Sequence, residues 1–340
     1  MDPAPYAWLM LLPGFEGLRV PTRFWIIGSL CLAAAVALAF DKLAPAHRGG
    51  RILLATLLAS GVLADGWLRV MPIGEAPALW PDVEPPGTGR ALLELPLGPE
   101  WDAAATYRAA HHRRRVVNGV SGHEPPHYPL LQLGLEARDP GVLTAIASLG
   151  PLDVVVNGAG DRDREWLRYV AATPGAEQVA SDGERTAYRV PAEAAHAQAF
   201  GEAWPVVTAM LPNGDGDARA VVDGDLASRW SSQVQVSGMT LALDLGSTRT
   251  VAGVSQAIGR WISDYPRQLV VETSLDGSRW SPAWQGRGLG PAIAGVMRAS
   301  NESRLLMPFT PREARLVRLR LVSDALASWT IAEVTAHGPR

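Results

Sequence analysis

The sequence predicts a multi-domain chain: a transmembrane helical hairpin, a small α/β extracytoplasmic domain and an all-β sandwich at the C-terminus. Three observations predict this fold class. Two long apolar runs lie within residues 1–70. Strand-like and helix-like segments alternate over residues 91–195, which is typical of a sheet covered by helices. Over residues 204–338, short β-type runs are separated by Gly, Asp, Asn and Ser, which indicates a sandwich or barrel.

The apolar runs cover residues 24–40, which carry no charge, and residues 52–68, where Asp65 is the one charged residue. A helix rises 1.5 Å per residue, so each run reaches ~25 Å, at the short end of what crosses a bilayer. The connector, residues 41–51, is basic, and the positive-inside rule places it in the cytoplasm. Everything after the second run is then expected outside the cytoplasm.

Two alternatives compete with this hairpin. A cleaved signal peptide is disfavoured because a second apolar run follows the first, while a buried helical hairpin of a soluble domain stays open. Residues 6–24 are interpreted as an interfacial segment, and residues 71–90, rich in Pro and Gly, as a linker.

Residues 91–195 are expected to form a mostly β layer covered by helices. The motif VNGAG, which follows an expected strand, lacks the spacing of a nucleotide-binding loop and is interpreted as a turn. The expected strands are Ala91–Leu97, Leu152–Gly158, EQVASD and RTAYRV, and the expected helices are Trp101–Arg115, Pro140–Leu149 and Arg162–Ala172.

The stretch SGHEPPHYPLL matches H-E-x-x-H, in which two histidines one helical turn apart bind zinc. In this chain, Pro125 and Pro126 occupy the two middle positions. Proline in a helix interior costs roughly 3 kcal/mol, so His123 and His127 are not expected to share a helical face. We therefore predict no zinc site and a rigid, extended segment.

Charge and cysteine content exclude some classes. The formal net charge is −3, which does not favour a nucleic-acid partner, and the single cysteine, Cys31, allows no disulfide within the chain. The basic cluster His111–Arg115 has three interpretations: a solvated helix end, which we favour, a contact with anionic lipid headgroups, or a contact with a lipid-linked phosphate.

The C-terminal region resembles the discoidin, or coagulation factor V/VIII type C, domain. The resemblance rests on five motifs in the family's order: AVVDGDLASRWSS, LALDLGS, YPRQLVVETSLDGSRW, FTPREARLVRLRL and WTIAEVTAHG. It implies an eight-stranded, jelly-roll-like sandwich whose loops at one end bind ligands, frequently glycans.

The same resemblance implies a structural calcium ion. By position, Asp223 and Asp225 supply carboxylate oxygens, Ser228 stands where Thr is usual, and Glu333 approaches from the last strand. Hard oxygen donors suit Ca²⁺. The alternative is an ordinary turn at Asp223 with Glu333 as a solvated strand residue.

For glycan binding, the loop RWISDYP offers Arg260, Trp261, Asp264 and Tyr265 together, because sugar rings stack on aromatic faces while polar side chains orient their hydroxyls. Trp261 is the expected platform. Three tryptophans inside the family motifs are expected in the core instead: Trp230, Trp280 and Trp329.

The front part, about residues 13–191, resembles the C-terminal region of bacterial multispanning glycosyltransferase-like membrane proteins that use polyprenyl-phosphate sugars. It does so through LPGFEGLRVPTRFWIIGSLCLA and NGVSGHEPPHYPLL. Together the resemblances imply a membrane-anchored carbohydrate-binding protein of the bacterial inner membrane, its C-terminal domains facing the periplasm or exterior, with a glycan or glycolipid as partner. The alternatives are the C-terminal portion of a glycosyltransferase whose catalytic half is absent, and a platform for a protein partner.

Overall fold

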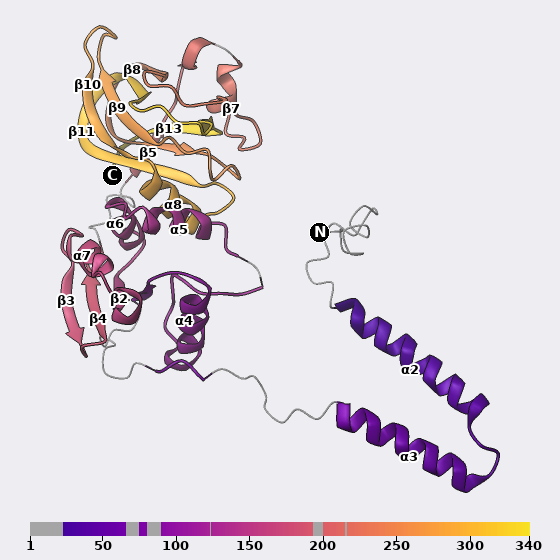
Figure 1. Ribbon diagram of the computed structural model, residues 1–340. Helices are drawn as coiled ribbons and strands as arrows, with labels where there is room; N and C mark the ends of the chain where they lie inside the picture. The colour runs from indigo at the N-terminus through magenta and orange to yellow at the C-terminus, as the bar shows by residue number, and fades with distance from the viewer. Residues whose placement is uncertain (1–22, 66–74, 80–89, 123, 193–199, 215) are drawn as a thin grey trace. The chain divides into compact units, whose positions relative to one another are not determined.

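The computed structural model describes residues 23–65, 75–79, 90–122, 124–192, 200–214 and 216–340. The chain divides into two compact units, Met1–Glu75 and Ala76–Arg340 (Figure 1).

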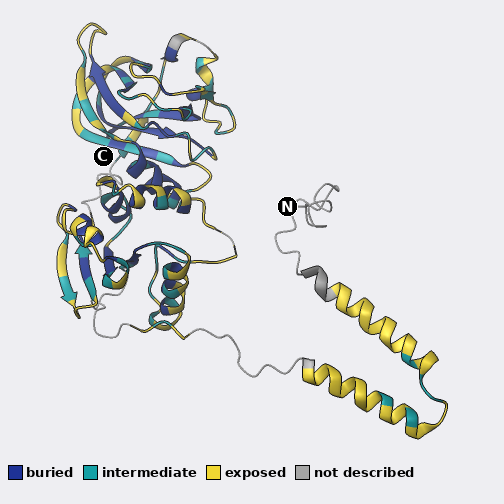
Figure 2. Ribbon diagram, viewed as in Figure 1, coloured by how far each residue is buried: buried dark blue, intermediate teal, exposed yellow. Residues whose placement is uncertain are grey.

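The first unit contains helices α2 (Arg23–Leu43) and α3 (Arg48–Asp65), whose described side chains are mostly exposed (Figure 2). Within the described ranges, no helix combines the length and apolar character that crossing a bilayer requires. The uncharged runs within these helices are residues 24–40 in α2 and 52–64 in α3. They are ~25 Å and ~20 Å long, whereas the hydrocarbon core is ~30 Å thick.

The predicted transmembrane hairpin is therefore wrong, and so is the inner-membrane location derived from it. The predicted interfacial segment lies almost wholly outside the described residues, and most of the predicted linker does too.

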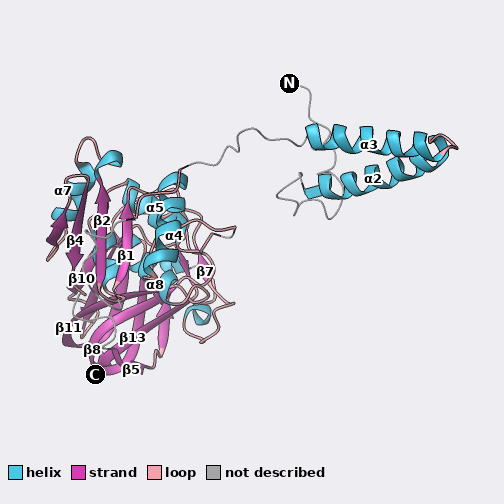
Figure 3. Ribbon diagram, turned by 90° about the horizontal axis from the view of Figure 1, so that it is seen from below, coloured by secondary structure: helices cyan, strands magenta, loops and turns pink. Residues whose placement is uncertain are grey.

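The second unit begins with a four-stranded sheet in the order β1-β2-β4-β3, in which β1 and β2 are parallel and the other pairs antiparallel (Figure 3). All four strands were predicted. Strand β2 is buried from Leu152 to Val156, as expected for a central strand covered on both faces. The strand bounds are β1 (Ala91–Leu95), β2 (Leu152–Asn157), β3 (Glu177–Ser181) and β4 (Arg185–Val190).

Four helices accompany this sheet, and three of them were predicted. Helix α4 ends three residues early because Arg113 adopts a left-handed conformation (φ 56°) and caps the helix. Helix α5 was missed, because its entry was interpreted as extended. The helix bounds are α4 (Pro99–His112), α5 (Tyr128–Glu136), α6 (Gly141–Ala147) and α7 (Glu165–Ala171).

The HEPPH segment leads into α5. His123 lies outside the described residues, residues 124–127 are not helical, and α5 begins at Tyr128, in keeping with the effect of the prolines. The buried Tyr128 hydroxyl donates a hydrogen bond to the buried Asp102 carboxylate of α4. Burial raises the pKa of Tyr128, and the hydrogen bond to Asp102 adds to this shift. Tyr128 therefore anchors the start of α5 to α4.

The C-terminal part is a β-sandwich, as predicted. Its large sheet has seven strands in the order β10-β9-β11-β8-β13-β5, with β6 paired to β8, and β12 pairs with β7 in a small second sheet. The strand bounds are β5 (Phe200–Trp204), β6 (Thr208–Met210), β7 (Trp230–Ser231), β8 (Thr240–Ala257), β9 (Gln268–Ser274), β10 (Ser281–Arg287), β11 (Arg304–Leu321), β12 (Thr330–Ile331) and β13 (Glu333–Pro339).

Strands β8 and β11 are each 18 residues long and pair along most of their length. Their register shifts twice, between Pro308 and Arg312 and between Ala314 and Leu316. A bulge bends the strand that contains it, so one long strand can serve two parts of the sandwich. The second shift falls in the RLVRLRL run, whose alternation alone left the register open.

Helix α8 (Leu289–Arg298), which lies between β10 and β11 in the chain, joins the two parts of the second unit. It packs against α5 and α6, and its Leu289 and Ile293 belong to the same buried cluster as the helices of the α/β sheet (Figure 1). A Cβ at Gly290 would lie 2.9 Å from the Gly141 carbonyl oxygen, so glycine allows the two helices to approach closely. Arg287 adds an ion pair of 3.1 Å to Asp139. The α/β part therefore shares one buried cluster with α8 and the adjacent sandwich residues, while the interior of the sandwich forms a second cluster.

Candidate functional site

Three loops at one end of the sandwich are tied together by Gln235, which is 1% exposed. Its Nε2 donates to the carbonyl oxygens of Tyr265 and Ser328, both at 2.9 Å, and its Oε1 accepts from the Arg267 backbone N–H at 2.9 Å. Buried amides that satisfy donors and acceptors in this way rigidify what they connect. The β7–β8, β8–β9 and β11–β12 loops are thus held in a fixed arrangement.

Trp261 lies in the β8–β9 loop and is flanked by two guanidinium groups. The Arg229 Cζ atom lies 3.8 Å from the Trp261 ring centroid and the Arg260 Cζ atom lies 5.0 Å from it. Trp261 is half-buried and both arginines are exposed. The structure therefore brings the predicted Arg260 and Trp261 together and adds Arg229 from another loop.

The other two predicted ligand-binding residues support this loop. The Asp264 carboxylate accepts a hydrogen bond of 2.8 Å from the Thr330 hydroxyl, and its carbonyl oxygen accepts one of 3.0 Å from the Thr330 N–H. Tyr265 is 2% exposed and belongs to the core; burial raises its pKa. Arg260 is thus exposed and Trp261 half-buried, whereas Tyr265 belongs to the core.

The acidic turn at Asp223 gathers oxygen atoms around one hydroxyl. Ser228 Oγ lies 2.9 and 2.8 Å from the two Asp223 carboxylate oxygens, 2.7 Å from the Asp225 carbonyl oxygen and 3.3 Å from the Ala220 carbonyl oxygen. A hydroxyl has one proton to donate, so Ser228 can satisfy only one of these four acceptor oxygens at a time. Such an excess of acceptor oxygens suits a hard cation such as Ca²⁺.

Glu333 reaches the same turn from β13, and its Oε2 accepts a hydrogen bond of 2.9 Å from the Gly224 N–H. Burial raises the pKa of Glu333, and the negative charge of Asp223 acts in the same direction. Backbone and Ser228 hydrogen bonds lower the pKa of Asp223. Over the described ranges, no group of three or more His, Cys, Asp or Glu side chains is arranged to hold a metal, so main-chain and hydroxyl oxygens have to complete any cation site here.

The three family-motif tryptophans differ in burial. Trp329 is fully buried, as predicted, and Trp230 packs edge-on against it with ring centroids 5.8 Å apart. Trp280 is half-buried, with the Arg318 Cζ atom 4.2 Å from its ring centroid. It lies in the turn between β9 and β10, which is not one of the loops that Gln235 ties together.

The basic cluster at the end of α4 is partly structural. Arg114 Nη2 lies 2.6 Å from Asp153 Oδ2, and Arg90 Nε lies 2.6 Å from Asp153 Oδ1. Asp153 is fully buried in β2, so these cations compensate an interior carboxylate. Arg113 caps the helix, which supports the helix-end interpretation.

Sequence reasoning missed Arg229 and Gln235. Arg229 was quoted only as part of a family motif, and Gln235 is a single polar residue in a loop. Their contacts join positions about thirty residues apart, which local patterns do not show.

The fold is that of a β-sandwich domain with three connected loops at one end. Residues 206–334 match the F5/8 type C domain family and form such a domain, as the sequence motifs predicted.

Several solved structures are similar to this domain. The CBM32 of AlyQ in complex with 4,5-unsaturated mannuronic acid is 21% identical, with 40% of this chain and 98% of that chain covered and a TM-score of 0.32. The family 32 CBM from C. perfringens NanJ, in complex with galactose, is 15% identical over 40% and 97%, with a TM-score of 0.31. A truncated AlyQ with CBM32 and alginate lyase domains, 21% identical, aligns over 41% of this chain but 33% of its own, with a TM-score of 0.32.

No curated protein matches the sequence. The comparisons give no support to the resemblance of the front part to membrane glycosyltransferases.

Proposed function

We propose that the F5/8 type C domain binds carbohydrate at the loop surface formed by Trp261, Arg229 and Arg260. The observation that carries the proposal is the Trp261 ring flanked by two exposed guanidiniums on loops that Gln235 holds in place. A preformed site loses little conformational entropy when a ligand binds.

The chemistry of these side chains suits a sugar. A pyranose ring presents C–H groups to an aromatic ring, while its hydroxyl oxygens accept hydrogen bonds from guanidinium N–H groups. The same guanidiniums can pair with a carboxylate bidentately, so a uronate fits this surface as well as a neutral sugar.

Calcium is the second part of the proposal. We propose a structural Ca²⁺ at the turn, held by carboxylate oxygens of Asp223 and Glu333 together with the Asp225 carbonyl oxygen and the Ser228 hydroxyl. Its support is the crowding of acceptor oxygens around the Ser228 hydroxyl. The adjoining residue is Arg229, so a cation here would fix the loop that delivers this guanidinium to Trp261.

The test is calorimetric titration of the full chain with galactose, the sugar in one of the two CBM32 structures above, and with mannuronic acid, the saturated counterpart of the sugar in the other. Trp261→Ala is expected to reduce the affinity about tenfold for whichever sugar binds, because the variant loses one stacking platform. Trp280→Ala is the matched control, because it removes another half-buried tryptophan that carries an arginine on its face. An equal loss of affinity in both variants would refute the proposal. So would the absence of binding to either sugar and to a glycan array, and a protein partner would then be the alternative.

A further inference from the structure

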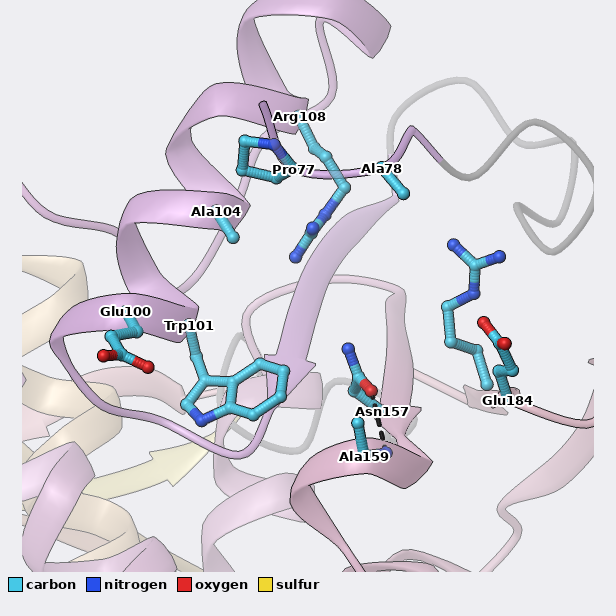
Figure 4. A pocket seen from close by; sticks show the side chains of 10 residues that line it. Pro77, Ala78, Glu100, Trp101, Ala104, Arg108, Asn157, Ala159 and Glu184 are labelled. Atoms are coloured by element: carbon cyan, nitrogen blue, oxygen red, sulfur yellow. Dashed lines mark hydrogen bonds between the residues drawn. The ribbon is translucent and has the colours of Figure 1, made fainter. Parts of the chain in front are cut away.

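A pocket with a few polar side chains lies in the α/β part of the chain, outside the F5/8 type C domain. It has a volume of about 320 Å³ and opens where β1 and β2 end (Figure 4). In sheets with parallel strands, ligands commonly bind beyond the carboxyl ends of those strands. The side chains that matter here are those of Glu100, Trp101, Arg108, Asn157, Glu184 and Arg185.

Trp101 supplies an aromatic surface of fixed position. It is half-buried near the start of α4. A Cβ at Gly160 would lie 2.9 Å from Trp101 Cζ2 and 2.6 Å from the Pro96 ring. The close packing of Gly160 against the edge of the indole therefore restricts the position of the Trp101 ring. Figure 4 shows this ring lying across the pocket.

Asn157 presents a hydrogen-bond donor. Its Oδ1 accepts a hydrogen bond of 3.0 Å from the Ala159 N–H, which fixes the orientation of the carboxamide. The amide nitrogen then points into the pocket, as Figure 4 shows. An NH₂ group held in this way can donate to a ligand oxygen.

The pocket has an excess of negative charge. Its two arginines are neutralised by carboxylates: Arg108 pairs with the buried Glu94, and Arg185 lies 2.7 Å from Asp182. Glu100 and Glu184 are exposed on opposite sides of the pocket, and no cation in the described part of the chain pairs with either (Figure 4). The pocket thus disfavours phosphates, sulfates and uronates and favours a cation.

We propose that this pocket binds a hexosamine residue with a free ammonium group. The Trp101 face receives the C–H face of the ring and attracts the adjacent cation. Glu184 pairs with the ammonium, Glu100 on the opposite side adds to the negative potential, and Asn157 donates to a ring hydroxyl. The volume is at the small end of ligand pockets, which matches a single sugar residue. This site is independent of the loop surface in the sandwich.

The experiment is saturation-transfer NMR on the full chain carrying Trp261→Ala, so that the proposed sandwich site is weakened and the pocket variants are compared in the same background. The probes are glucosamine, N-acetylglucosamine and glucuronic acid. Glucosamine is expected to bind, N-acetylglucosamine about fivefold more weakly because the ammonium is lost, and glucuronic acid not detectably.

Adding Trp101→Ala is expected to weaken glucosamine binding about tenfold, and adding Glu184→Gln about threefold. Glu184 is exposed, so its variant keeps the test usable if Trp101→Ala fails to fold. Tyr107→Ala, on the same helix but outside the pocket, and Glu177→Gln, on β3, are controls expected to bind as before.

The proposal is overturned if glucosamine does not bind, if glucuronic acid binds equally well, or if the Trp101 and Glu184 variants behave like the controls. Because these measurements are made without Trp261, they leave the sandwich proposal untouched. Failure of galactose and mannuronic acid to bind the wild-type chain would count against the sandwich site alone.

Discussion

His337 on β13 is a titratable side chain that the fold keeps neutral. Its ring stacks on Phe200 of β5 with centroids 4.5 Å apart, and its Nε2 lies 2.9 Å from Ser255 Oγ on β8. Burial, followed by the positive charge of Arg304, lowers the pKa of His337 from 6.5 to about 4. Below pH 6.5 the unfolded chain therefore binds a proton that the folded chain does not.

This difference gives the stability a defined pH dependence. A depressed folded-state pKa contributes stability that is fully present above about pH 6.5 and is lost as the pH falls towards 4. Each pKa unit corresponds to 1.36 kcal/mol, so a shift of this size amounts to about 3 kcal/mol of unfolding free energy. Below about pH 4 both states are protonated, and this contribution changes no further.

Urea unfolding followed by tryptophan fluorescence at pH 7.5, 5.5 and 4 measures the effect. Carboxylates titrate in the same range, so the quantity to compare is the loss of unfolding free energy in wild type and in His337→Gln. The variant is expected to lose about 3 kcal/mol less between pH 7.5 and 4. His111→Gln, which changes an exposed histidine at the end of α4, is expected to follow the wild type. If His337→Gln loses as much stability as wild type, the reasoning is wrong.

Three further predictions concern other parts of the chain. Calcium at 100 times its Kd is expected to stabilise wild type by about 2.7 kcal/mol but not Asp223→Asn, and thermal melts with and without chelator measure this. Arg108→Met removes the cation that pairs with buried Glu94 and is expected to cost about 3–5 kcal/mol, most of it recovered when Glu94→Gln is added; urea titration measures both. Ile293→Ala opens a cavity in the core shared by α8 and the α/β part and is expected to cost about 2–5 kcal/mol by urea titration, whereas Leu326→Ala, 95% exposed, is expected to change little.

Local sequence patterns predicted most of the regular elements of the second unit. The short apolar runs of β1 and β2 and the alternation in β4 are local signals, and the structure contains all three strands. Helix α8 was missed because its segment, rich in Ala and Gly, lies among β-type runs. Its helical state depends on packing against α5 and α6, which is tertiary information.

The error in the first unit has a different cause. Apolar composition over residues 24–40 and 52–68 was taken as sufficient for a transmembrane hairpin. The described helices do not reach the required combination of length and apolar character, because charged residues bound the apolar stretches of both.

The candidate site was predictable where one motif carried the signal. Arg260 and Trp261 are neighbours in a polar loop, so their proximity could be expected. Arg229 reaches the same ring from a segment about thirty residues away, and only the closed sandwich brings it there. The burial of Tyr265 likewise depends on the core that the sandwich shares with the α/β part.

The hydrogen bonds of Gln235 have a consequence for how the loops at this end of the sandwich can evolve. All three side-chain bonds end on main-chain atoms, at Tyr265, Arg267 and Ser328. Main-chain atoms are the same whatever side chain a position carries, so substitutions at the exposed loop positions leave these three hydrogen bonds in place. One buried amide thus fixes the positions of the loops independently of their exposed side chains, so those side chains can change without rebuilding the scaffold.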